Sequence, residues 1–92
     1  MATLHMEVEA VQGTQQKMVS QKEAMVNELA TLTGQINQTV GSAWIGNSAT
    51  EFQQQYDALR GQVTQQLESL GQLAQALQAE IAQWQEMSAR MG

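Results

Sequence analysis

The sequence contains no cysteine and no proline, and it has few aromatic and few basic residues. Without cysteine there can be no disulfide, no thiol nucleophile and no cysteine metal site. Without proline, nothing removes a backbone amide or clashes with the preceding turn of a helix. A chain of 92 residues buries only a modest share of its surface, and it has no disulfide to compensate. Association with a partner is therefore the expected source of additional stability.

Positive charge is scarce and dispersed. Nine Asp and Glu residues give a formal net charge of −5 against only four cations, which are Lys17, Lys22, Arg60 and Arg90. Nucleic acids and anionic membranes attract clustered Lys and Arg, so we expect neither a nucleic-acid partner nor stable membrane insertion. No run approaches the ~18 apolar residues typical of a membrane span. A secretory signal peptide is also missing, which taken alone predicts a cytoplasmic protein.

Groups suited to catalysis or metal binding are equally sparse. His5 is the only histidine, so one chain cannot supply a metal site with several histidine ligands. No Ser-His-Asp triad can be assembled around His5 with the geometry that such a triad demands. Gly41 and Gly46 lack the following Lys and Ser or Thr of a phosphate-binding loop. We therefore expect no enzyme, no cofactor and no metal site.

Two long segments repeat apolar residues alternately four and three positions apart, which is typical of amphipathic helices. The first spans about residues 4–40 and the second about residues 49–90. In each segment a second apolar stripe lies one residue after the main series, so the apolar face is wider than a two-stranded coiled coil needs. This width favours a four-helix bundle. The residues predicted to form the hairpin and dimer seam are Val19, Val26, Leu29, Leu32, Ile36, Leu67, Leu70, Leu77 and Ile81.

The break at about residues 41–48 contains the signals that end one helix and begin another. Gly41 stands where a helix C-terminus favours positive φ. The S-x-x-E sequence that starts at Ser48 fits a capping box at the start of the second helix. A short link makes the two helices antiparallel neighbours. We therefore predict an all-α protein, a single antiparallel two-helix hairpin over residues 1–92 that dimerises into a four-helix bundle.

Polar residues interrupt the apolar series at Gln15, Lys22 and Glu80. Polar side chains at such positions cost stability but can fix register and partner choice. Counting outward from a turn near residue 44 places Lys22 opposite about residue 66. We therefore expect any cationic partner of Glu80 to come from another chain.

The tripeptide Trp44-Ile45-Gly46 lies in the break. Trp44 can cover the apolar end of the hairpin, and Gly46 can adopt a backbone conformation that other residues adopt only at a cost. A W-x-G sequence between two long helices, in a chain of about this length without cysteine or proline, resembles the WXG100 (ESAT-6-like) family. The resemblance covers essentially the whole chain.

This resemblance implies export through a type VII (ESX-like) secretion system without a cleaved signal peptide. Members are exported folded, as antiparallel dimers. We expect a homodimer first, a heterodimer with a WXG100 paralogue as the alternative, and the type VII secretion ATPase as a further partner. The protein would then be cytoplasmic before export and extracellular afterwards. The competing interpretation is an intracellular coiled-coil adaptor that is not secreted.

The same resemblance suggests a secretion-recognition surface in which the turn of one hairpin meets the tail of the other. The residues expected to form it are Trp44, Trp84, Met87 and Met91. Alternatively, the three tail residues simply complete the apolar seam.

The C-terminal part departs from the family pattern. Many members carry Y-x-x-x-[D/E] after the second helix, whereas the only tyrosine here, Tyr56, lies early in that helix and is followed four residues later by Arg60. Three explanations stay open: a partner supplies the export signal, the chain uses another signal, or it is not an independently exported substrate.

Overall fold

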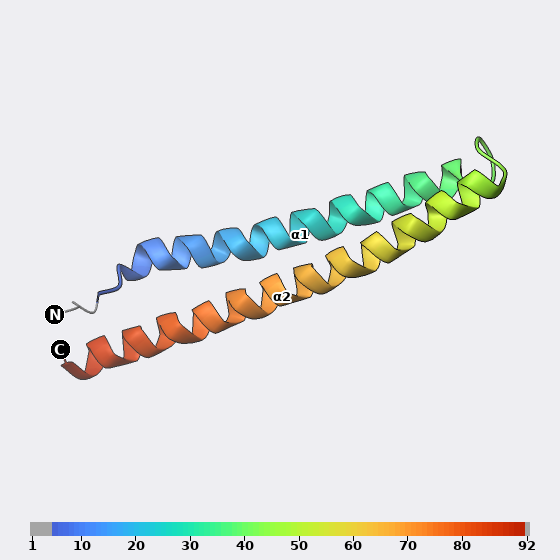
Figure 1. The fold of residues 1–92 in the computed structure, drawn as a ribbon. Helices are drawn as coiled ribbons and strands as arrows, with labels where there is room; N and C mark the ends of the chain where they lie inside the picture. The colour runs from blue at the N-terminus through green and yellow to red at the C-terminus, as the bar shows by residue number, and fades with distance from the viewer. Residues whose placement is uncertain (1–4, 92) are drawn as a thin grey trace.

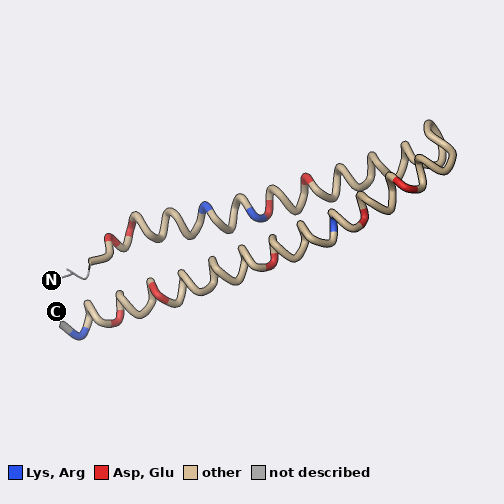
Figure 2. The backbone as a smooth tube through the Cα atoms, in the orientation of Figure 1, with Lys and Arg blue, Asp and Glu red and all other residues tan. Residues whose placement is uncertain are grey.

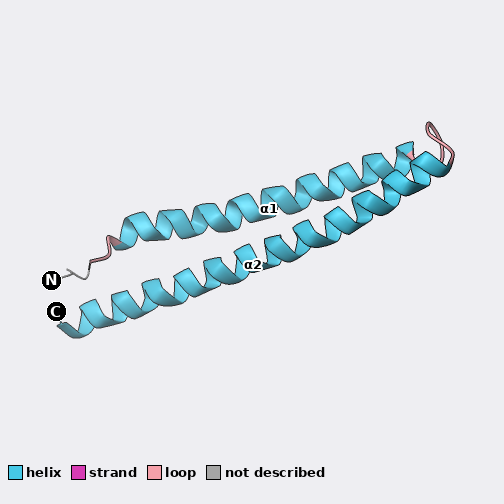
Figure 3. Ribbon diagram, in the orientation of Figure 1, coloured by secondary structure: helices cyan, strands magenta, loops and turns pink. Residues whose placement is uncertain are grey.

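The computed structural model describes residues 5–91, apart from the side chain of Met91. These residues form two helices, α1 (Val8–Thr39) and α2 (Asn47–Met91), joined by a short connection over residues 40–46 (Figures 1 and 3). The helices run antiparallel and side by side, so the connection lies at one end of a rod and both ends of the described chain lie at the other (Figure 1). The rod measures 68 × 23 × 17 Å. The predicted all-α two-helix hairpin is confirmed.

Helix α1 begins at Val8, four residues later than the sequence predicts. Glu7 is the N-cap residue, but its side chain makes no capping hydrogen bond. His5 and Glu7 are both exposed, so little burial would offset the conformational entropy lost by extending the helix through them. The helix therefore starts where its apolar face starts to be covered.

Helix α2 begins at Asn47, two residues earlier than predicted. Gly46 already supplies the non-helical residue that precedes a helix, because its φ is +134° and its carbonyl accepts a hydrogen bond from the Thr50 amide at 3.2 Å. Glycine is one of the residues favoured at this position. Ser48 and Glu51 consequently lie inside α2 and do not form the predicted capping box.

The core of the hairpin is a line of α2 side chains that face α1. Its buried residues are spaced by seven or eleven positions, so they lie on one side of the helix. They are Ala49, Tyr56, Leu67, Ala74 and Ile81. By contrast, α1 has no buried residue over its whole described length. One hairpin therefore leaves the apolar side of α1 only partly covered.

Hydrogen bonds between the helices fix their register. The Gln15 side-chain amide donates to the carbonyl of Ala74 at 3.3 Å, and the hydroxyls of Thr33 and Tyr56 lie 2.7 Å apart. Moving seven residues along each helix from the Gln15–Ala74 pair brings Lys22 level with Leu67. The position counted from the sequence, about residue 66, agrees within one residue.

Lys22 reaches beyond Leu67 and lies against Gly71. A Cβ atom placed on Gly71 would lie 3.0 Å from Lys22 Nζ and 3.3 Å from Lys22 Cε. Helical side chains point toward the N-terminus of their own helix. In an antiparallel pair, that direction leads toward higher residue numbers of the neighbouring helix. Gly71 thus leaves room for the Lys22 side chain where it crosses α2.

Candidate functional site: the W-x-G turn and an exposed apolar face

The connection between the helices folds back on itself through backbone hydrogen bonds. The Trp44 amide donates to the Thr39 carbonyl at 3.0 Å, and the Gly41 amide donates to the Trp44 carbonyl at 2.9 Å. Gly41 has a φ of +97°, as its position at the end of α1 predicts. This turn brings the Trp44 ring against Phe52 of α2, with the ring centroids 5.4 Å apart and the planes tilted by 47°. Trp44 is therefore held at the end of the hairpin by both backbone and ring contacts.

A large part of the turn nevertheless stays open to solvent. Trp44 is 39% exposed and Ile45 is 76% exposed. Trp44 and Phe52 also line a hollow together with Leu32 and Ile36 of α1. Trp44 thus covers the end of the hairpin incompletely, and an apolar recess continues from it along both helices.

The predicted seam residues divide into two groups. Those that face the other helix of the hairpin are buried or half-buried, and they are Leu29, Ile36, Leu67, Leu70, Leu77 and Ile81. Val19, Val26 and Leu32 are exposed instead. The second stripe of α2, with Leu67 and Ile81, is therefore buried inside the hairpin and is not free to contact a partner.

The large apolar residues of α2 that are exposed form one row at intervals of seven. They are Phe52, Leu59, Leu73 and Met87, between 41% and 60% exposed, and the exposed residues Gln66 and Glu80 complete the row. The spacing of four and three over residues 49–90 includes this row and also an inward row, which comprises Tyr56, Val63, Leu70, Leu77 and Trp84. The spacing alone does not separate the two rows. Residues seven positions apart belong to the same row, and this interval is the sequence signal that distinguishes the exposed row from the inward row.

A parallel row on α1 lies beside it. Leu32 lines a hollow with Phe52 and Leu59, and Met18 lines another with Leu73 and Glu80. Met25 lies midway between Met18 and Leu32 in the same seven-residue series. The two rows together form one continuous surface that borders the W-x-G turn. We call it the front face, and it comprises Met18, Met25, Leu32, Phe52, Leu59, Gln66, Leu73, Glu80 and Met87.

Val19 and Val26 lie on the other side of the hairpin. Each follows a front-face residue by one position, and one position turns a helix by about 100°. The two valines therefore flank the inward line of α1 on the side away from Met18 and Met25. Charged residues are scattered along both helices, Lys22 and Glu23 are adjacent, and the connection over residues 40–46 contains none (Figure 2).

The residues of the predicted recognition surface are not brought together within one chain. Trp44 lies at the connection, whereas Trp84 and Met87 lie near the opposite end of the rod (Figure 1). Trp84 is half-buried and Met87 is 46% exposed; the Met91 side chain lies outside the described part. The register places Val8 level with Ile81, so the last turns of α2 extend beyond the start of α1.

Within residues 5–91 there is no group of three or more side chains suited to holding a metal ion. Over the same residues, neither helix has a stretch apolar enough to cross a membrane.

Comparison with known proteins identifies the family of the chain. Residues 3–87 match the WXG100 family, described as proteins of 100 residues with WXG. No curated protein and no solved structure matches the chain. Members of this family are small, helical, non-enzymatic secreted proteins that commonly form dimers and leave the cell without a signal peptide. With a W-x-G turn between two long antiparallel helices and a family match over nearly its full length, this chain belongs to the WXG100 family.

Proposed function

We propose that this protein is exported by, or associated with, a type VII (ESX-like) secretion system. It acts there as one half of a dimer of helical hairpins, either as a secreted substrate or as a co-secreted partner. The observation that carries the proposal is an apolar front face that borders a half-exposed Trp44 in a chain of this family. The sequence contains no catalytic constellation that would favour another role.

The front face supports the dimer. Contiguous exposed apolar surface on a small protein marks an interaction site, and α1 lacks any buried residue over its described length. A second hairpin laid on the front face would cover Leu32, Phe52, Leu59 and Leu73 together. The product is a four-helix bundle, in which apolar rows from four helices face a common core.

The dimer would also assemble the proposed recognition surface. In an antiparallel pair of rods, the tail of one hairpin lies beside the turn of the other. Trp44 of one chain would then approach Met87 and Trp84 of its partner, where α2 extends beyond α1. We propose that the type VII secretion ATPase binds this surface. Because the surface exists only in the assembled, folded pair, the ATPase would then select the dimer for export.

An export assay tests the proposal. The protein should accumulate outside cells that contain a functional type VII secretion ATPase and stay inside cells whose ATPase is inactivated. Retention inside both strains would favour the intracellular coiled-coil adaptor. A protein that appears outside both strains to the same extent would exclude this ATPase as the route.

Trp44→Ala tests the recognition surface separately. Loss of the indole should reduce export at least tenfold while dimer mass and helix content, measured by light scattering and circular dichroism, stay unchanged. Ile45→Ser, at the more exposed neighbouring position, is the matched control for general disturbance of the turn. Normal export of a dimeric Trp44→Ala protein would refute the role of Trp44.

A further inference from the structure

The apolar residues of the front face include sulfur-containing side chains. Of the four methionine side chains that the structure describes, three lie on this face, and they are Met18, Met25 and Met87. The exposed apolar residues on the other side of α1 are Val19 and Val26, which contain no sulfur. The chain has no cysteine either, so no thiol of its own competes for an oxidant. The oxidisable sulfur atoms of the two helices are therefore gathered on the surface that docks in the proposed dimer.

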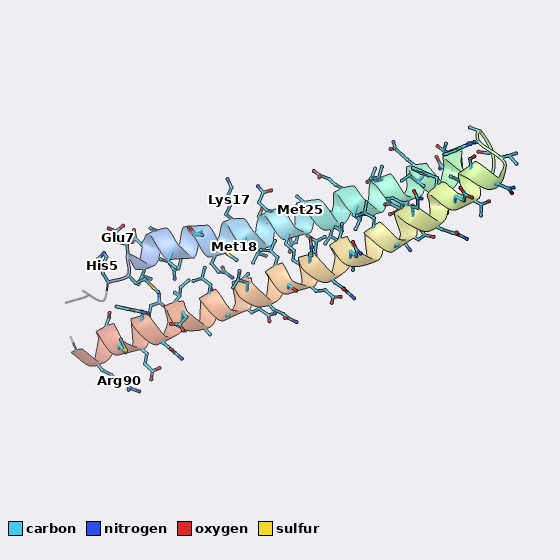
Figure 4. All side chains as sticks on the ribbon, viewed as in Figure 1. His5, Glu7, Lys17, Met18, Met25 and Arg90 are labelled. Carbon is cyan, nitrogen blue, oxygen red and sulfur yellow. The ribbon has the colours of Figure 1, made fainter. Side chains whose placement is uncertain are left out.

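Solvent reaches these methionines to different extents in a single hairpin. Met25 is 41% exposed and Met87 is 46% exposed. Met18 is half-buried between the two helices, where it lines a hollow with Leu73 and Leu77 (Figure 4). A dissolved oxidant therefore reaches Met25 and Met87 of an unpaired chain directly, and Met18 more slowly.

Hydrogen peroxide oxidises a methionine thioether in one two-electron step. A lone pair on the sulfur attacks one peroxide oxygen, so an S–O bond forms and the O–O bond breaks. The departing hydroxide takes the proton of the transferred oxygen, and the products are methionine sulfoxide and water. The sulfur is oxidised and the peroxide is reduced. The step converts a flexible apolar side chain into a polar one.

A sulfoxide affects the pair more than it affects the single hairpin. On the exposed Met25 of a lone hairpin the new oxygen stays in water. A second copy laid on the front face removes that water, and a buried polar group without a hydrogen bond is unfavourable. Gln66 is the only front-face side chain with a hydrogen-bond donor, and one donor cannot serve sulfoxides at three levels of the rod. Oxidation therefore opposes docking without opposing the fold of the hairpin.

We propose that Met18, Met25 and Met87 make pairing of the hairpin sensitive to peroxide: oxidation of the unpaired chain blocks docking, and docking shields the thioethers. This inference rests on the proposed dimer, taken between two copies of the chain. The block is reversible, because a methionine sulfoxide reductase removes the oxygen as water while two thiols are oxidised to a disulfide. Pairing thus depends on the redox conditions that the chain meets before it docks.

Self-association of the purified full chain, measured by sedimentation equilibrium before and after treatment with hydrogen peroxide, tests the block. Oxidation should raise the self-dissociation constant at least tenfold, while circular dichroism shows unchanged helix content. The matched control carries Met18→Leu, Met25→Leu and Met87→Leu and keeps the remaining methionines and both tryptophans. Its constant should change less than twofold. Equal weakening of both proteins, or none in the wild type, would overturn the inference.

Reduction of the oxidised wild type tests reversibility. Because each sulfoxide epimer needs its own reductase, both enzymes are added with dithiothreitol as the thiol. The original self-dissociation constant should return as mass spectrometry shows loss of the added oxygen. A constant that stays raised after the oxygen is gone would assign the weakening to other damage and contradict the proposal.

Shielding by the pair has a separate readout. Trypsin cleaves after Lys and Arg, which leaves Met18, Met25 and Met87 in three different peptides, each without another methionine. Fragmentation of these peptides locates the added oxygen. Met25 should be oxidised at least fivefold more slowly above the self-dissociation constant than below it. Leu73→Glu, which stays unpaired, should show one rate at both concentrations. Equal rates in the wild type would contradict the shielding.

Leu73→Glu also distinguishes failure of the inference from failure of the proposed dimer. In untreated chain it should abolish self-association if the front face is the docking surface. If it does so while peroxide leaves pairing of the wild type unchanged, the front-face dimer stands and the role of the methionines falls. If Leu73→Glu pairs as tightly as the wild type, or the wild type does not pair, the self-paired front-face dimer and this inference fall together.

Discussion

At the scale of single residues, the polar side chains between the helices have specific partners. Gln15 donates to a backbone carbonyl of α2, Thr33 meets Tyr56, and Lys22 lies over Gly71. Their positions in the apolar series are visible in the sequence, but their partners are not. Each partner depends on the register to within one residue and on how far a side chain reaches along the neighbouring helix. The glycine that accommodates Lys22 carries no sequence signal of its own.

The Thr33–Tyr56 hydrogen bond should contribute measurably to stability. The Thr33 hydroxyl donates its proton to the Leu29 carbonyl at 2.8 Å, so the Tyr56 hydroxyl is the donor in the 2.7 Å contact. Thr33→Val leaves this buried tyrosine without its acceptor and should lower the free energy of unfolding by about 1–3 kcal/mol. Urea denaturation at one fixed protein concentration measures the change.

Thr31→Val is the control for Thr33→Val. The Thr31 hydroxyl is exposed and bonds only to the carbonyl of Asn27 in its own helix. Its loss should change stability by less than about 0.5 kcal/mol. Equal effects of the two substitutions would mean that the bond between the helices adds nothing.

Two glycines should respond to alanine in opposite directions. Gly34 lies inside α1 and a Cβ there would meet nothing within 4 Å, so Gly34→Ala should stabilise the protein by about 0.5–1 kcal/mol. Gly41 has a φ of +97°, so Gly41→Ala should destabilise it by about 1–2 kcal/mol. Thermal melting followed by circular dichroism distinguishes them, and a shift of the same sign in both would contradict the role of the turn.

At the scale of the helix, α2 has two apolar rows with different tasks. Ile81 belongs to the line of buried residues that forms the core of the hairpin and is 0% exposed, whereas Leu73 belongs to the exposed row of the front face and is 60% exposed. In the single chain, Ile81→Ala should cost about 2–5 kcal/mol of unfolding free energy, because it empties a packed position. Leu73→Ala should cost about 0.5 kcal/mol or less, as exposed positions do.

Chemical denaturation at concentrations where the chain is monomeric checks this difference. An Ile81→Ala protein that unfolds like Leu73→Ala would show that the line of buried α2 residues does not form the core of the hairpin.

The two helices and their antiparallel arrangement follow from the sequence, because the apolar spacing and the W-x-G break are local signals. The ends of the helices follow less well. Gly46, not Ser48, precedes α2, since a backbone geometry that only glycine adopts readily outweighed a side-chain cap. The assignment of apolar rows to the hairpin or to a partner needs the actual rotation of each helix. The periodic pattern alone does not determine which of two neighbouring apolar rows faces the other helix of the hairpin.

At the scale of the whole molecule, the two sides of the rod should differ in their effect on pairing. Leu32 and Val26 are each 45% exposed on α1, but only Leu32 lies on the front face. Leu32→Glu should abolish association with a partner hairpin, because it buries an unpaired charge. Val26→Glu should change the affinity less than about threefold. Light scattering of the complexes measures both.

The same two substitutions, Leu32→Glu and Val26→Glu, also test the prediction that Val19 and Val26 lie in the dimer seam. If Val26→Glu weakens association as strongly as Leu32→Glu, the partner also covers the side of the rod that carries the valines, and the sequence prediction for those two residues would hold.

The slenderness of the rod sets a lower limit on the passage through which it can travel without unfolding. Its two short dimensions are 23 and 17 Å, and laying a second rod on the front face roughly doubles one of them. An aperture that admits a lone hairpin lengthwise can therefore block the joined pair. Whether two hairpins joined by a covalent tether are still transported would therefore show whether the conduit is wide enough for the folded pair.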